Sequence, residues 1–194
     1  MIDPKDADAY INRGGCYYKI GEYDQAMLDF TKAIEMNPKD AYAYTIRGNI
    51  YHIKEEYDRA ILDFTKAIEI NPGDAHVYAM RGAIYASKGE YDRAIEDCTK
   101  AIEINPGFID AYNNRGCAFS EKEEYNRAIL DYEKAMEIDP DYALAYLNRA
   151  EVYAKLGKSE EAKKDLLKTL ELDPKLEESV KELSEQYKLD LKLD

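Results

Sequence analysis

The chain has 194 residues, of which 35% are charged and 45% hydrophobic, with 18 tyrosines, no tryptophan and a formal net charge of −13. This composition is typical of a folded helical protein and argues against a disordered chain. The acidic balance argues against nucleic acid and anionic membranes as partners, because binding to either depends on Lys and Arg side chains that neutralise phosphates.

Six prolines divide the chain into units of equal length. No other proline is present, and each follows the one before it by 34 residues: Pro4, Pro38, Pro72, Pro106, Pro140 and Pro174. A fixed period of this kind indicates an internal repeat. We therefore expect the tail of a preceding repeat at 1–6, repeats at 7–40, 41–74, 75–108, 109–142 and 143–176, and a capping helix with a frayed tail at 177–194.

Each repeat is expected to hold two amphipathic helices. In 41–74 the residues Tyr44, Gly48 and Tyr51 recur at helical spacing, and a second set follows the KEEYD segment: Ala60, Phe64, Ala67 and Ile68. Small residues recur at one position of each helix and should let the two backbones approach closely. They are Gly14, Gly48, Gly82, Gly116 and Ala150 on the first helix, and Ala26, Ala60, Ala94, Ala128 and Ala162 on the second.

The expected helix ends have local causes. The Asn71–Pro72 step should end the second helix of its repeat, because the residue before a proline avoids helical dihedral angles. Three aspartates are placed to cap the helix that follows: Asp6, Asp40 and Asp74. The turn inside a repeat suits a left-handed residue, and three repeats have glycine there: Gly21, Gly89 and Gly157. Glu55 and Glu123 take this place in the other two, where we expect strain of about 1 kcal/mol.

A column of arginines and a column of aspartates, sixteen residues apart, run through all five repeats. The arginines could form a basic ladder that grips an acidic ligand. The alternative, which we favour, is a charge-assisted hydrogen bond that ties the two helices of one repeat together. The pairs are Arg13 with Asp29, Arg47 with Asp63, Arg81 with Asp97, Arg115 with Asp131, and Arg149 with Asp165.

These residues resemble a known family. The pattern Y-x-x-R-G-x-x-Y of 41–74, followed by its Ala, Phe, Ala and Pro, resembles the tetratricopeptide repeat, whose signature is W-x-x-L-G-x-x-Y, A, F, A, P. The resemblance covers residues 7–176, with Tyr in place of Trp and Arg in place of Leu throughout. It implies an all-α fold, a right-handed α-solenoid superhelix of stacked antiparallel helix pairs.

The resemblance also implies a concave groove, because the first helix of each repeat lines that face in tetratricopeptide proteins. An asparagine column at Asn12, Asn114 and Asn148 could hold a peptide backbone, or could simply be tolerated on a helix surface. The middle of the groove should be apolar and suited to hydrophobic anchors. By position, the groove residues are Asn12, Tyr42, Thr45, Ile46, Asn49, His52, His76, Ala79, Met80, Ala83, Asn113, Asn114, Cys117, Asn148 and Glu151.

Catalytic chemistry is not indicated. The sequence contains no HExxH, P-loop, GxSxG or Gly-rich dinucleotide motif. His52 and His76 could in principle form a metal pair and Cys117 could be a reactive thiol, but ordinary surface and half-buried roles are favoured for all three. We therefore expect no enzyme activity, no cofactor and no metal. The unrelated spacing of Cys16, Cys98 and Cys117 indicates reduced thiols.

The function expected from these features is a protein–protein interaction module that binds a peptide or helix of a partner in the concave groove. The partner should be neutral to basic and carry an apolar anchor, and the chain should be a monomer or associate weakly. The alternatives are a structural or self-associating spacer array, and a regulatory domain excised from a larger protein. The sequence lacks a signal peptide and a long apolar run, so we expect a cytoplasmic location.

Overall fold

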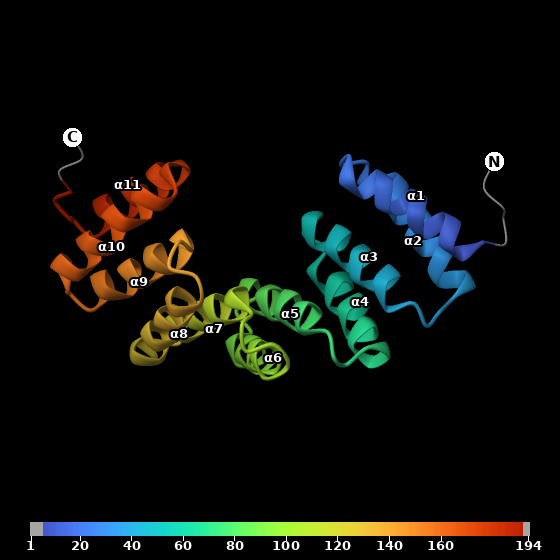
Figure 1. Ribbon diagram of the computed structural model, residues 1–194, viewed down its shortest axis with the longest axis horizontal. Helices are drawn as coiled ribbons and strands as arrows, with labels where there is room; N and C mark the ends of the chain where they lie inside the picture. The colour runs from blue at the N-terminus through green and yellow to red at the C-terminus, as the bar shows by residue number, and fades with distance from the viewer. Residues whose placement is uncertain (1–5, 192–194) are drawn as a thin grey trace.

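The computed structural model describes residues 6–191, and within that range the chain forms eleven α-helices, one short 3₁₀ turn and no β-strand (Figure 1). None of these helices has both the length and the hydrophobicity needed to span a bilayer. Their bounds are α1 Ala7–Lys19, α2 Tyr23–Met36, α3 Ala41–Ile53, α4 Tyr57–Ile70, α5 Ala75–Ser87, α6 Tyr91–Ile104, α7 Ile109–Glu121, α8 Tyr125–Ile138, α9 Ala143–Lys155, α10 Ser159–Leu172, η1 Pro174–Leu176 and α11 Glu177–Gln186.

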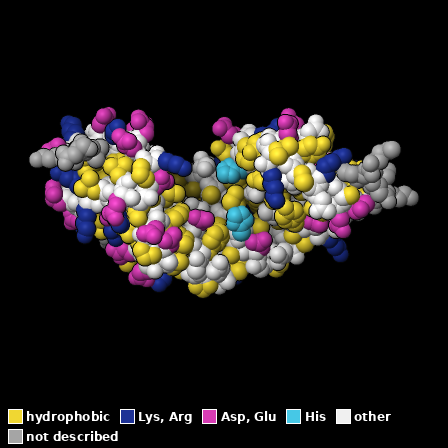
Figure 2. Space-filling view, turned by 45° about the horizontal axis from the view of Figure 1, so that its top comes forward, with side chains coloured by type: hydrophobic (Ala, Val, Ile, Leu, Met, Phe, Trp, Pro, Cys, Tyr) yellow, Lys and Arg dark blue, Asp and Glu magenta, His cyan; other side chains and the backbone are white. Residues whose placement is uncertain are grey.

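The helices form a curved stack. The two helices of a repeat pack along each other, and the second helix of each repeat packs against the first helix of the next. In Figure 1 the stack is an arc with α1 and α11 at its ends, with α3 and α5 on the inner side and α4 and α6 on the outer side. We call the surface formed by the first helices the inner face. Figure 2 shows that this face is hollowed at its middle, where the two histidines lie.

The core of each repeat lies where its two helices approach most closely. The alanine of the second helix is fully buried in every repeat. Four residues later in each repeat a larger side chain fills the space beside the small residue of the first helix, and this position is also buried throughout: Phe30, Phe64, Cys98, Tyr132 and Leu166. The pattern that predicted two amphipathic helices per repeat is confirmed.

The helix ends follow the predicted signals. The side chains of Asp6, Asp40 and Asp74 accept hydrogen bonds from backbone N–H groups in the first turns of α1, α3 and α5. The helix before Asn71 ends at Ile70. Phe108 and Tyr142 stand where the aspartates stand in the other repeats, and their side chains make no capping bond to α7 or α9.

The turns between paired helices all contain a left-handed residue. Gly21, Gly89 and Gly157 have φ of 80°, 75° and 72°, while Glu55 and Glu123 both have φ of 59°. The two glutamates therefore adopt the conformation that costs a residue with a Cβ about 1 kcal/mol or more.

Replacing Glu55 or Glu123 with glycine should raise the free energy of unfolding by up to about 1 kcal/mol at each position, because glycine enters this conformation without strain. Urea denaturation followed by far-UV circular dichroism measures the change. As a control, Gly89→Ala should lower the free energy by a similar amount, since it introduces a Cβ at φ of 75°. Unchanged stability in all three variants would contradict the assignment of strain.

The C-terminal end differs from the prediction of a frayed tail. Helix α11 caps the stack as expected, with Val180 and Leu183 buried against α10 and α9. Beyond it, Lys188 turns the chain back with φ of 53°, and Leu189 becomes buried in the same cluster. The segment 187–191 is thus held to the stack by Leu189, with Tyr187 and Leu191 partly buried beside it. The expectation for 1–5 and that for 192–194 concern segments outside the described residues.

Candidate functional site

The five predicted Arg–Asp pairs form bidentate ion pairs between the two helices of a repeat. In each pair the arginine Nε and Nη2 donate to the two carboxylate oxygens of the aspartate, at 2.6–2.9 Å. Hydrogen bonding to Asp63 raises the pKa of Arg47, so its guanidinium stays charged. Two parallel hydrogen bonds of this kind fix the orientation of the two side chains and also strengthen the contact between the helices.

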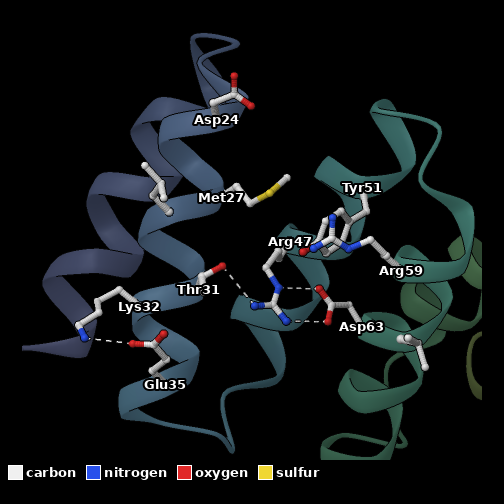
Figure 3. A pocket seen from close by; sticks show the side chains of 11 residues that line it. Asp24, Met27, Thr31, Lys32, Glu35, Arg47, Tyr51, Arg59 and Asp63 are labelled. Carbon is white, nitrogen blue, oxygen red and sulfur yellow. Dashed lines mark hydrogen bonds and ion pairs between the residues drawn. The ribbon is translucent and has the colours of Figure 1, made fainter.

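Four of these arginines also reach across the junction between repeats, which the sequence did not lead us to expect. The Nη1 of Arg47 donates to Thr31 Oγ1 of the preceding repeat at 3.2 Å (Figure 3). The equivalent bonds join Arg81 to Thr65, Arg115 to Thr99 and Arg149 to Glu133. The sequence does contain a pattern that could have predicted these bonds: a threonine or glutamate lies sixteen residues before each of the four arginines.

Aromatic rings also lie near the guanidinium groups of this column. The Arg47 guanidinium lies 5.7 Å from the ring centre of Tyr44 and 5.9 Å from that of Tyr51. Arg59 of the second helix stacks on Tyr51 at 4.3 Å. Because only 15% of the Arg47 side chain is exposed, this arginine is a structural element and not an open ligand for acidic partners.

A second charged column ties successive repeats together. Lys54, at the end of α3, pairs with Asp24 of the preceding repeat at 2.5 Å, and Lys88 pairs with Asp58 at the same distance. Lys122 pairs with Asp92 in the same way. The column ends at the last junction, where Leu156 replaces the lysine and Asn126 the aspartate. Surface pairs of this type contribute little energy individually.

The middle of the inner face carries the apolar residues predicted for it. Tyr42 is 54% exposed, and Ile46, Met80 and Ala83 are partly exposed. The imidazole of His52 lies 6.0 Å from the ring of Tyr57, and that of His76 lies 6.0 Å from the ring of Phe108. Each histidine therefore has an aromatic neighbour. Within residues 6–191 no group of three or more His, Cys, Asp or Glu side chains is placed to hold a metal ion.

Two residues predicted for the groove do not line an open surface. Asn113 is only 7% exposed and Ala79 only 3%, because the neighbouring helices cover them. Asn113 Oδ1 accepts a hydrogen bond from Asn148 Nδ2 at 2.9 Å, and the same Nδ2 lies 3.5 Å from Cys117 Sγ. Asn148 thus links repeats 4 and 5 through its Nδ2, so part of its amide is already used. Asn12 is exposed and Asn114 partly exposed.

Two other polar groove residues have local partners, and a third lacks one for its buried oxygen within residues 6–191. Thr45 Oγ1 donates to the carbonyl oxygen of Ala41 at 2.9 Å, and Glu151 pairs with Lys155 at 3.0 Å. Asn49 is partly exposed, but its Oδ1 is buried and has no hydrogen-bond partner within the described residues. A buried acceptor without a partner costs about 1–3 kcal/mol. Thr45 and Glu151 are therefore already engaged in local contacts, whereas Asn49 retains an acceptor that is unpaired in the described part of the chain.

The three cysteines differ in accessibility. Burial raises the pKa of Cys98 to about 12 and also raises the pKa of Cys117. Cys16 is exposed. Because the thiolate is the reactive form, the hypothesis of a reactive Cys117 loses support.

A thiol-reactive disulfide reagent should therefore modify one cysteine per folded chain, Cys16, at mildly alkaline pH. All three should react after denaturation. Counting the released chromophore in the native protein and in the Cys16→Ser variant checks the assignment. Rapid release from native Cys16→Ser would show that Cys98 or the partly exposed Cys117 is accessible to the reagent, contrary to this assignment.

The stacked helix pairs define an α-helical solenoid. The family model for the tetratricopeptide repeat matches residues 7–40, 41–74, 75–108 and 143–176. Two related models, described as a TPR repeat and a tetratricopeptide repeat, match 118–157 and 98–129. The chain belongs to the tetratricopeptide repeat family.

Solved structures share this architecture. The crystal structure of MamA protein has 26% sequence identity and a TM-score of 0.76, covering 89% of this chain and 94% of that one. YrrB, a TPR protein with an unusual peptide-binding site, also has 26% identity, with a TM-score of 0.72 and 88% coverage of both chains. PilW, a type IV pilus biogenesis factor, shares the fold at 18% identity, with a TM-score of 0.84 and coverage of 93% and 84%. No curated protein matches the chain in sequence.

Proposed function

We propose that the chain is a non-enzymatic interaction module whose inner face binds a peptide or helical segment of another protein. The observation that supports this most directly is the uncharged apolar patch on α3 and α5, made of Tyr42, Ile46, Met80 and Ala83. Such a patch suits one or two hydrophobic anchor residues of a partner. YrrB, the relative with a peptide-binding site, makes peptide recognition a reasonable expectation for this fold.

The net charge of the chain favours some partner segments over others by their charge. With a net charge of −13, the protein favours neutral or basic segments, because like charges repel at long range. The asparagines contribute less than the sequence suggested, since Asn148 is held by Asn113. We therefore propose that binding depends on the apolar patch first, with Asn12 and Asn114 as additional polar contacts.

Random peptides displayed on phage and selected on the immobilised protein supply ligands for the test. The double variant Ile46→Gln with Met80→Gln should weaken binding of the selected peptides at least about tenfold, because the apolar patch becomes polar. Fluorescence anisotropy measures the affinity. The control is Leu130→Gln, on the outer face of α8, where 64% of the residue is exposed. Equal binding by both variants would exclude the inner face as the site.

A second candidate function is self-association through the side of α1 that corresponds to the stacking surface of the later repeats. Cys16 is exposed, whereas the residues at the same repeat position are fully buried by the preceding repeat: Ile50, Ile84, Ala118 and Val152. Ile20, which directly follows α1, is 71% exposed. Sedimentation velocity over a range of concentrations tests this function. A concentration-dependent dimer that Ile20→Glu abolishes would support it, and a monomer at all concentrations would exclude it.

A further inference from the structure

A cleft on the outer side of the stack lies between the second helices of repeats 1 and 2, away from the inner face. It has a volume of about 860 Å³, with α2 and α4 as its walls and α3 below (Figure 3). Met27 and Leu28 line it from α2, Tyr51 from α3, and Leu62 from α4. This volume falls within the range of sites that bind ligands and peptide side chains.

The two walls carry exposed leucines at equivalent repeat positions. Leu28 is 65% exposed and Leu62 is 69% exposed. In the later repeats the same position holds Glu96, Leu130 and Lys164. The junction of α2 with α4 is therefore the only one of the four with leucine on both walls. Single exposed apolar residues are ordinary on protein surfaces, whereas two exposed leucines that line one cleft give a partner more apolar surface to cover.

Most charged groups around the cleft are already paired. Arg47 bonds to Asp63 and Thr31, and Lys32 pairs with Glu35 at 3.0 Å (Figure 3). Asp24 pairs with Lys54. A partner therefore gains little by contacting these groups, so apolar contacts must supply most of the binding energy.

Arg59 is also paired, but one of its donor groups is available to a partner. Its Nη1 donates to Glu56 at 2.6 Å, and its guanidinium covers the Tyr51 ring at the edge of the cleft, as Figure 3 shows. In the next repeat Arg93 makes the same two contacts and also donates Nη2 to Tyr85 Oη. Within residues 6–191 the Nη2 of Arg59 has no such acceptor. With 58% of its side chain exposed, Arg59 can donate to a carboxylate that enters the cleft.

The backbone of the cleft indicates the shape of its occupant. Both walls are α-helices whose backbone groups bond within the helix, so no sheet edge is available to pair with an extended peptide. A helical segment satisfies its own backbone groups and needs only side-chain contacts. We propose that this cleft binds an amphipathic helix of a partner protein, with leucine-sized residues between Leu28 and Leu62 and an Asp or Glu beside Arg59.

A phage-displayed library of helix-forming peptides tests the proposal. Its members carry Leu, Met or Phe at i and i+4, and either Asp or Asn at one flanking position. The double variant Leu28→Glu with Leu62→Glu should weaken binding of the selected peptides at least about tenfold, while Leu130→Glu, equally exposed at the same repeat position, should change it less than about twofold. Arg59→Gln should weaken the Asp peptides and leave the Asn peptides unaffected. Circular dichroism confirms that each variant is folded.

Other outcomes would overturn the proposal. No enrichment over an uncoated control, or equal binding by wild type and Leu28→Glu with Leu62→Glu, would show that the cleft does not bind helices. Peptides weakened only by the inner-face variant Ile46→Gln with Met80→Gln would belong to the proposed function instead. Wild-type protein that dimerises through Leu28 and Leu62 would make a second copy the occupant. The outer-cleft and inner-face variants thus distinguish the two proposals.

Discussion

Replacing Asp97 with alanine should lower the free energy of unfolding by about 3 kcal/mol or more, the cost of leaving one partner of a buried ion pair alone. The side chain of Arg81 is 15% exposed and that of Asp97 is 7% exposed. The substitution removes both acceptors of the bidentate contact, so the guanidinium keeps only Thr65 of the preceding repeat and two tyrosine rings. Urea denaturation followed by far-UV circular dichroism measures the loss.

The same substitution in the first repeat is the matched control. The Arg13 side chain is 45% exposed, so water can solvate its guanidinium when Asp29 is removed. We expect Asp29→Ala to cost about 1 kcal/mol. Replacing both members of the central pair, as Arg81→Met with Asp97→Leu, should recover most of the stability, since apolar side chains of similar size can substitute for a buried ion pair. Equal losses at Asp97 and Asp29 would contradict a role for burial.

Features that depend on neighbouring residues could be predicted from the sequence. The aspartate caps, the end of α4 before Asn71 and the left-handed turn positions follow from local backbone chemistry, and the structure shows all of them. The period of 34 then placed every later helix, because one repeat is copied along the chain. The arginines and aspartates could be paired for the same reason, since both columns keep one spacing.

Features that depend on how the repeats stack on one another could not be predicted from the sequence as well. The bond from Arg47 to Thr31 crosses a junction whose geometry no single repeat contains. The pattern placed Asn113 and Asn114 side by side in the groove, but the next helix buries Asn113 and leaves Asn114 partly exposed. The outer cleft was missed because the helical pattern identifies the apolar stripe that packs inside a repeat, and Leu28 and Leu62 lie off that stripe. Only the packed stack shows that these two exposed leucines line one cleft.

A substitution where the paired helices approach most closely should also change the free energy of unfolding strongly. Gly116→Ala should lower the free energy of unfolding by about 1–3 kcal/mol, the usual cost of overpacking, even though alanine is the better helix former. A Cβ at Gly116 would lie 2.6 Å from Cε1 and 3.0 Å from Cδ1 of Tyr132, which is itself 1% exposed and has no room to move away. The loss should extend to both neighbouring repeats, since each repeat packs only on its neighbours.

The fifth repeat accommodates an alanine at the position of Gly116, and this difference suggests a second variant that tests the cause of the loss. There Ala150 takes the place of the glycine and Leu166 the place of the tyrosine, and both are fully buried. Tyr132→Leu should therefore relieve part of the cost of Gly116→Ala, which a double-mutant cycle measures as a coupling energy of about 1 kcal/mol. Gly15→Ala is the control, because no atom outside its own helix lies within 4 Å of the added Cβ. It should raise stability by up to about 1 kcal/mol, whereas a loss like that of Gly116→Ala would show that contact with the aromatic ring is not the cause.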